Sequence, residues 1–195
     1  MRRVRLRADA RRAQIVETAF GMIAADGLEQ FRTRDVAERV GINPATLHHY
    51  FPTKEDLILG VGEHLEAAFI NARETSTTPR RLTPLQALRR EFADAAVVRK
   101  RRQRWLAVSR ELATRAPRDA AAAAVVRRLT AGWRASIESV LDAGVADGSF
   151  RADLDARGAS LVIVSALWAA NAFLQLPDRE FRKLCRELER SVSIR

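Results

Sequence analysis

Apolar residues recur with the spacing of α-helices along nearly the whole chain. In residues 9–26, Ile15, Ala19 and Met22 fall on one stripe, as expected of a helix with one buried face. No segment alternates apolar and polar residues as a strand does, and only residues 147–149 suggest a short turn or hairpin. The pattern therefore predicts an all-α fold.

Two short helices joined by a tight turn follow this first helix. One covers residues 33–40 and ends at Gly41, whose freedom to adopt positive φ suits a helix end. Asn43 then supplies a helix cap and Pro44 the first position of a second short helix, 44–51. A turn this short fixes the angle between the two helices.

A long helix connects this unit to the rest of the chain. Thr53 and Asp56 have the spacing of a capping box and open a helix that extends to about Glu74. The polar, helix-breaking residues 75–79 come next. Further helices are predicted near residues 84–99, 100–116, 119–146, 155–175 and 178–192. We place the domain division at residue 56, between an N-terminal three-helix domain 1–56 and a larger helical domain 57–195.

The spacing within residues 33–51 fits a helix-turn-helix, which binds DNA by placing its second helix in the major groove. A shared apolar core is available from Val36, Ala37, Val40, Ile42 and Leu47. The outward side then carries Ala45, Thr46, His48, His49 and Tyr50. Their methyl, hydroxyl, imidazole and phenol groups suit contacts with base edges. Any two short helices joined by a glycine turn give the same pattern, so the spacing alone does not decide the function.

The stretch from Ile15 to Leu57 as a whole resembles the tetracycline-repressor (TetR-like) family of transcription regulators. The motifs that carry the resemblance are Arg34-Asp35-Val36-Ala37, Gly41-Ile42-Asn43, Ala45-Thr46-Leu47 and Tyr50-Phe51-Pro52-Thr53-Lys54-Glu55. Beyond this stretch the chain is similar to the family only in length and helical layout. The resemblance implies a dimer that binds a palindromic operator in double-stranded DNA, with one recognition helix for each half-site.

The resemblance also implies roles for individual residues. Phosphate contacts are implied for Thr33, Tyr50 and Lys54, and contacts with base edges or nearby backbone for Arg34, Pro44, Ala45, Thr46, His48 and His49. The chain departs from the family at two positions: Arg32 stands where a capping Thr is frequent, and His48 where Tyr is common.

Each of these residues also has an ordinary structural alternative. Tyr50 and Phe51 can be core side chains, an interpretation we favour for Phe51. Lys54 can be a solvated lysine, although its position at a helix N-terminus lets its ammonium and backbone N–H groups meet one phosphate.

Charge permits a polyanionic partner, because 34 Lys and Arg against 24 Asp and Glu give a net charge of +10. The excess lies mostly outside the first 56 residues. Basic side chains gather in an N-terminal arm made of Arg2, Arg3, Arg5, Arg7, Arg11 and Arg12, which is either a DNA-binding arm or a solvated terminus. The run from Arg99 to Arg104 is in the same way either a solvated helix face or a second DNA contact.

The compartment expected from the sequence is the cytoplasm. Cys185 is the one cysteine, so no intramolecular disulfide can form, and the N-terminus lacks the apolar core of a secretory signal. Residues 158–177 are uncharged and long enough to span a bilayer. Their polar side chains, Ser160 and Asn171 among them, favour a helix buried in protein instead, and we expect no membrane contact.

The C-terminal helices contain the residues expected to bind a small-molecule effector. All three tryptophans lie there, and aromatic side chains with a few polar groups commonly line ligand pockets, although they also fill ordinary cores. The pocket candidates are Phe92, Trp105, Trp133, Ile137, Trp168 and Asn171. An apolar or aromatic effector is the expectation.

The last two helices are expected to form a homodimer. The final helix places apolar residues on one stripe, and the preceding helix is apolar nearly all round, so that one face can cover its own domain and the other a second copy. The interface candidates are Leu161, Val164, Trp168, Phe181, Leu184 and Leu188.

An enzyme is the first rival to a regulator. His48 and His49 are adjacent on a helix and diverge, so they cannot readily share a metal, and no cysteine cluster or HExxH pattern is present. Nucleophile-elbow, phosphate-loop and dinucleotide motifs are also missing. We therefore expect no catalytic residue, metal or cofactor. The second rival is a DNA-binding regulator that needs no ligand and is controlled by a protein partner.

Overall fold

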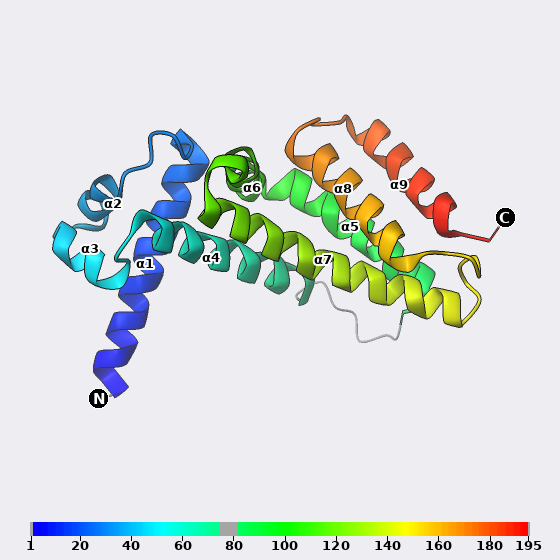
Figure 1. Ribbon diagram of the computed structural model, residues 1–195, viewed down its shortest axis with the longest axis horizontal. Coiled ribbons are helices and arrows are strands. Elements are labelled where there is room, and N and C mark those ends of the chain that lie inside the picture. The colour runs from blue at the N-terminus through cyan, green and yellow to red at the C-terminus, as the bar shows by residue number, and fades with distance from the viewer. Residues whose placement is uncertain (1, 75–81, 195) are drawn as a thin grey trace. The chain divides into compact units, whose positions relative to one another are not determined.

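Helices account for the regular structure throughout the described part of the chain in the computed structural model, which describes residues 2–74 and 82–194 and the side chains of 8–71 and 82–194. The α-helices are α1 (Arg2–Asp26), α2 (Thr33–Val40), α3 (Pro44–Tyr50), α4 (Lys54–Glu74), α5 (Pro84–Arg101), α6 (Gln103–Arg115), α7 (Ala120–Ala146), α8 (Ala156–Ala172) and α9 (Asp178–Val192) (Figure 1). A single turn of 3₁₀-helix, Ala116–Arg118, precedes α7. The prediction of an all-α fold is confirmed.

The main difference from the predicted helices is at the N-terminus. Helix α1 begins at Arg2 rather than near Asp9, because an arginine-rich segment has good helix propensity and can extend the helix. The side chains of the predicted arm up to Arg7 lie outside the described residues, as does the predicted breaker at 75–79. At its other end α1 stops before Gly27, which has the positive φ of 78° expected of a helix C-cap.

The turn predicted at 147–149 is present without a hairpin. Gly148 has a φ of 76°, and the backbone of Phe150 then forms an isolated antiparallel bridge with Ser193. The strand-like contact is limited to this one pair.

The described residues form two compact units. The first, the head unit, holds residues 2–74 and 107–127, and the second, the body unit, holds 82–106 and 128–194. These units reflect packing rather than function, so the division at residue 56 stays a prediction.

The head unit is built around the apolar stripe of α1. Helices α2 and α4 both pack on α1 (Figure 1), where Ile15 and Ala19 are fully buried. Of the predicted core shared by α2 and α3, burial is confirmed for Val36, Ala37, Val40 and Leu47, while Ile42 in the turn is half-buried. Phe51 is also buried, as favoured from the sequence.

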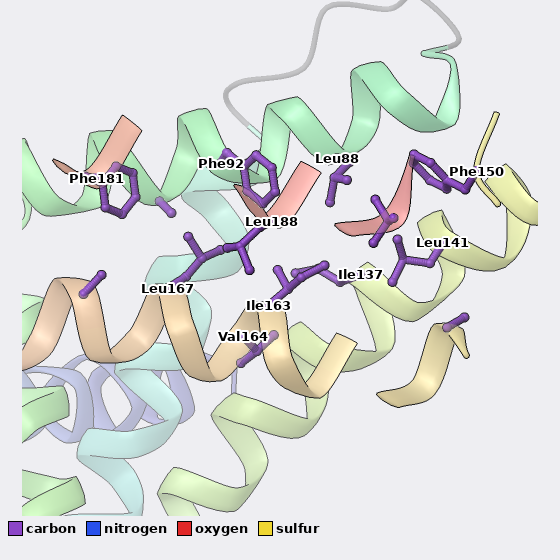
Figure 2. Close-up of a cluster of buried hydrophobic side chains, with 14 residues drawn as sticks. Leu88, Phe92, Ile137, Leu141, Phe150, Ile163, Val164, Leu167, Phe181 and Leu188 are labelled. Atoms are coloured by element: carbon purple, nitrogen blue, oxygen red, sulfur yellow. The ribbon is translucent and has the colours of Figure 1, made fainter. Parts of the chain in front are cut away.

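The body unit has a core of its own, to which α5, α7, α8 and α9 contribute. Figure 2 shows this cluster, whose labelled members are Leu88, Phe92, Ile137, Leu141, Phe150, Ile163, Val164, Leu167, Phe181 and Leu188. Helix α8 buries Ile163, Leu167 and Ala170 here, which explains the apolar character of its inner face. None of the described helices has the length and apolar character needed to cross a membrane.

Candidate nucleic-acid interface

A tight turn fixes α3 relative to α2. Gly41 adopts the left-handed conformation, with φ 72° and ψ 37°, and the N–H of Ile42 donates to the carbonyl of Ala37 over 3.0 Å. The side chain of Asn43 then caps α3 by accepting from the N–H of Ala45 over 2.8 Å, and Pro44 follows at the first helical position. The signals found in the sequence are therefore the ones that set this geometry.

Helix α3 turns one face inward and presents the other to solvent. Leu47 is 1% exposed and holds the helix to the head core. The side chains on the other face are exposed, namely Pro44, Ala45, Thr46, His48 and His49. Tyr50 is half-buried, and its ring packs edge-on against that of His49 with 5.6 Å between centroids. The exposure predicted for this face is confirmed, while the DNA-binding role of each residue stays a prediction.

Two of the three residues proposed as phosphate contacts, Thr33 and Lys54, lie at helix N-termini, whereas Tyr50 ends α3. Arg32 makes no side-chain capping bond to α2, so the first-turn N–H groups of Thr33 and Arg34 lack the cap that a Thr would provide. Arg34 is 78% exposed, 3.9 Å from Asp35. Uncapped N–H groups beside an exposed guanidinium form an arrangement that suits a phosphate.

Lys54 begins α4, and its ammonium lies 5.5 Å from the centroid of the Phe31 ring. The capping box predicted there is confirmed, since Asp56 accepts from the Thr53 N–H over 3.0 Å and the Thr53 hydroxyl accepts from the Asp56 N–H over 3.0 Å. Contact with Phe31 restricts the lysine stem, so its charge stays close to the N-terminus of α4.

Contacts between α1 and α4 support this end of the head. Arg12 forms an ion pair with Glu63 over 3.3 Å, and its guanidinium lies 4.9 Å from the centroid of the Phe51 ring. His64 lies 3.0 Å from the carboxylate of Glu17. Both pairs connect α1, on which α2 packs, with α4, which follows α3.

Residues 107–127 make head contacts that were not expected from the sequence. Glu111 of α6 accepts a 3.1 Å hydrogen bond from the N–H of Leu28, in the loop that follows α1. A Cβ added to Gly62 of α4 would meet the side chain of Val125 of α7. Gly62 gave a weak signal, because glycine is unfavourable within a helix, whereas nothing near Glu111 marks its partner 83 residues away.

The predicted effector residues fall into different environments. Phe92 and Ile137 lie in the body core, and Trp133 packs against that core while its indole N–H donates to Glu91 over 3.0 Å. Trp105 and Trp168 are half-buried, and the Arg102 guanidinium lies 4.7 Å from the Trp105 ring. The structure thus brings three candidates together in a packed core.

Asn171 is the most polar of these candidates and is 9% exposed. Its Nδ2 donates to the Ala95 carbonyl over 3.2 Å, and its buried Oδ1 has no partner among the described residues. A buried acceptor of this kind carries a desolvation cost that a donor can relieve.

The residues predicted to form the dimer interface, like the effector candidates, differ in their burial. Leu161 is 49% exposed, and Trp168 and Leu184 are half-buried. By contrast, the body core buries Val164, Phe181 and Leu188. Their role in a dimer stays a prediction, although side chains that fill their own core have little surface left for a second copy.

Two residues of the basic run 99–104 form ion pairs with α9. Arg99 and Lys100 lie 2.7 and 2.8 Å from the carboxylate of Asp178 at the start of α9. Hydrogen bonds from Lys100 and then Arg99 lower the pKa of Asp178 to about 2. An ion pair with α9 is a third role for this run, besides a solvated helix face or a second DNA contact.

Cys185 is half-buried on α9, and burial raises the pKa of its thiol to about 11. Nowhere in the described ranges 8–71 and 82–194 do three His, Cys, Asp or Glu side chains gather as metal ligands do.

A tight turn followed by an exposed helix is the arrangement of helix-turn-helix DNA-binding proteins. Basic groups at helix N-termini lie on either side of this helix in the sequence. Residues 15–61 match the family model described as bacterial regulatory proteins, tetR family. The HTH-type transcriptional repressor KstR2 of Mycolicibacterium smegmatis is 29% identical over 147 residues, covering 75% of this chain and 70% of that protein. KstR2 of Rhodococcus jostii is 25% identical over 171 residues, covering 82% and 78%.

Solved structures share the fold. A TetR transcription regulator from Haloarcula marismortui gives a TM-score of 0.80 at 19% identity and covers 95% of this chain and 100% of that one. The ketosteroid transcriptional regulator KstR2 of Mycobacterium tuberculosis gives 0.64 at 20% identity and covers 95% and 96%. The resemblance found in the sequence is confirmed: residues 15–61 match the tetR family model, and the repressors to which the chain is similar over most of its length support a DNA-binding transcription regulator. Its relatives regulate transcription and are not enzymes.

Proposed function

We propose that the protein is a repressor that binds a palindromic operator as a homodimer and is released by a small apolar or aromatic ligand. The observation that carries the DNA-binding part is the exposed face of α3, held in place by the buried Leu47. In this proposal residues 1–56 bind DNA, and 57–195 bind the effector and the second subunit. Repression is favoured over activation because relatives that match over 70% or more of their own length are named as repressors.

The dimer is supported by the outer face of α8. Leu161 and Val162 are 49% and 60% exposed, and adjacent exposed apolar side chains favour burial against another surface. A two-fold axis at this face would match a palindromic operator, on which the two α3 helices must sit roughly 34–36 Å apart.

Release is supported by two features of the head unit that lie outside the helix-turn-helix. Helix α4 continues from the capping box at Thr53, and Glu111 of α6 holds the loop after α1. A ligand that prefers a conformation in which α4 or α6 is displaced shifts the population away from DNA binding. Because such coupling is reciprocal, operator DNA weakens ligand binding by the same factor, typically about 1–3 kcal/mol.

DNA selection tests the DNA-binding part. From a random pool the wild-type protein should enrich a palindrome, and Thr46→Ala or His49→Ala should change which bases are enriched. Lys54→Ala should weaken all sites alike and reduce the slope of log affinity against log salt by about one. Lys183→Ala removes a lysine of α9 that pairs with Glu180 and serves as the matched control. Unchanged binding in all three test variants would contradict the docking of α3.

The dimer and the ligand need their own measurements. The full-length protein should have a dimeric mass at micromolar concentration, and Leu161→Asp with Val162→Asp should give a folded monomer. A tryptophan-fluorescence screen with aromatic compounds should find ligands that also dissociate the operator complex. If every ligand that binds leaves DNA affinity unchanged, the protein-partner rival is supported instead.

A further inference from the structure

We propose that His48 selects adenine or cytosine in the operator, with its Nε2 accepting a hydrogen bond from the base amino group. This inference rests on the proposed DNA binding by α3. It assigns a base class to one position of the recognition helix.

The hydrogen bond at the other ring nitrogen determines the tautomer. Nδ1 of His48 lies 3.2 Å from the carbonyl oxygen of Pro52. A carbonyl oxygen can only accept, so Nδ1 must carry the hydrogen. In the neutral ring Nε2 is then unprotonated and is a hydrogen-bond acceptor.

The start of α4 explains why the Pro52 carbonyl is available. Pro52 lies before Thr53, whose carbonyl accepts the first hydrogen bond of α4, from the N–H of Leu57 over 3.4 Å. The Pro52 carbonyl therefore takes no part in the hydrogen bonding of the helix. Its contact with His48 ties the ring to the junction between α3 and α4.

An acceptor at this position has a defined complement in DNA. His48 is exposed on the same short helix as Thr46 and His49. In the major groove, adenine N6 and cytosine N4 are donors, whereas guanine N7 and O6 and thymine O4 are acceptors. A neutral His48 held in this tautomer thus favours adenine or cytosine and disfavours guanine and thymine at the base it meets.

Nitrogen NMR tests the tautomer without DNA. Long-range ¹H–¹⁵N spectra of the full-length protein, recorded at a pH where the imidazole rings are neutral, should show a protonated Nδ1 and an unprotonated Nε2 for His48. Comparison with His48→Ala assigns the signals. The opposite tautomer would overturn the proposal.

Selection from a random DNA pool tests the base preference. The wild-type protein should enrich adenine or cytosine at one position of each half-site, and His48→Ala should lose roughly tenfold or more of that preference there. Lys54→Ala is the matched comparison, because it should weaken binding while the same base is kept. Melting curves check that the variants fold.

The outcomes separate this inference from the proposed function. A wild-type protein that binds no DNA contradicts the proposed function itself. A wild-type protein that binds DNA but enriches the same bases as His48→Ala at every position contradicts only the role of His48. Enrichment of guanine or thymine at the position that responds to His48→Ala also overturns the proposal.

Discussion

The head and body units place their candidate residues in opposite ways. In the head, the proposed DNA contacts come from the short stretch 33–54, and most of them face solvent on α3. In the body, Phe92, Ile137 and Trp133 come from α5 and α7 and turn toward a packed core. A site built from neighbouring residues on one helix can be identified from sequence, whereas one assembled from distant helices requires the structure.

The same contrast holds for basic residues. Arg34 of the head is 78% exposed, whereas Arg99 of the body is largely buried against Asp178. Arg89 pairs with Glu189 through hydrogen bonds of 2.9 and 2.6 Å, which raise the pKa of Arg89 and lower that of Glu189. Net charge therefore does not locate the DNA-binding surface, because part of the basic excess holds α5 against the start and the end of α9.

The largest expected effect separates the stability of the two units. A Cβ at Gly144 of α7 would overlap the ring of Phe150, which is 1% exposed. Gly144→Ala should therefore lower the free energy of unfolding of the body by about 1–3 kcal/mol. All three tryptophans lie in the body unit, so urea unfolding followed by tryptophan fluorescence measures this change.

Gly132→Ala is the matched control, in the same helix. Its added Cβ meets nothing within 4 Å, so the alanine should be neutral or stabilising by up to about 1 kcal/mol. Equal effects at the two glycines would show that the packing of Phe150 on α7 is not as tight as described.

Sequence patterns between neighbouring residues predicted the helix ends of the head well. The contacts that were not predicted join residues far apart in the chain. The cap at Asn43 and the box of Thr53 with Asp56 involve neighbours two or three residues apart, and both are present. Periodicity identifies the apolar faces of α8 and α9 without showing which side chains are covered by their own core, as Val164 and Phe181 are. The tie of Glu111 to Leu28 depends on the folded chain and has no pattern in the sequence.

The second prediction concerns that tie between α6 and the loop after α1, both in the head unit. Glu111→Ala leaves the part-buried N–H of Leu28 without its acceptor, so the head should lose about 1–2 kcal/mol of stability. Amide hydrogen exchange in α1 measures the stability of the head, while tryptophan fluorescence reports the body. Glu111→Gln keeps an acceptor oxygen and should retain most of the stability. A loss seen equally by both probes would mean that the two units unfold together.

A smaller effect is expected at the ion pair between α5 and α9. Arg89 is 58% exposed, so the gain from its pairing with Glu189 is reduced by solvent. Arg89→Ala should cost about 0.2–1 kcal/mol, and the cost should fall as salt is added. Body unfolding in low and high salt measures it, with Arg179→Ala as a control on an exposed arginine of α9. A cost that does not change with salt would point to lost packing instead of lost charge.

The smallest effect, and the most specific one, is the pH dependence at Asp178. Its pKa is lowered from 3.8 to about 2, so its carboxylate is more stable in the folded body than in the unfolded chain. The stabilisation is fully present above pH 3.8 and is lost as the pH falls through about 2. Asp178→Asn should therefore lower stability at neutral pH and have a much smaller effect at pH 2, as measured by body unfolding between pH 7 and 2. Because the hydrogen bond from Lys100 is the largest cause of the lowered pKa, Lys100→Ala should raise the pKa of Asp178 toward 3.8 in a carboxyl NMR titration. If the pKa stays near 2 in that variant, the pairing of the basic run with α9 is not what holds it down.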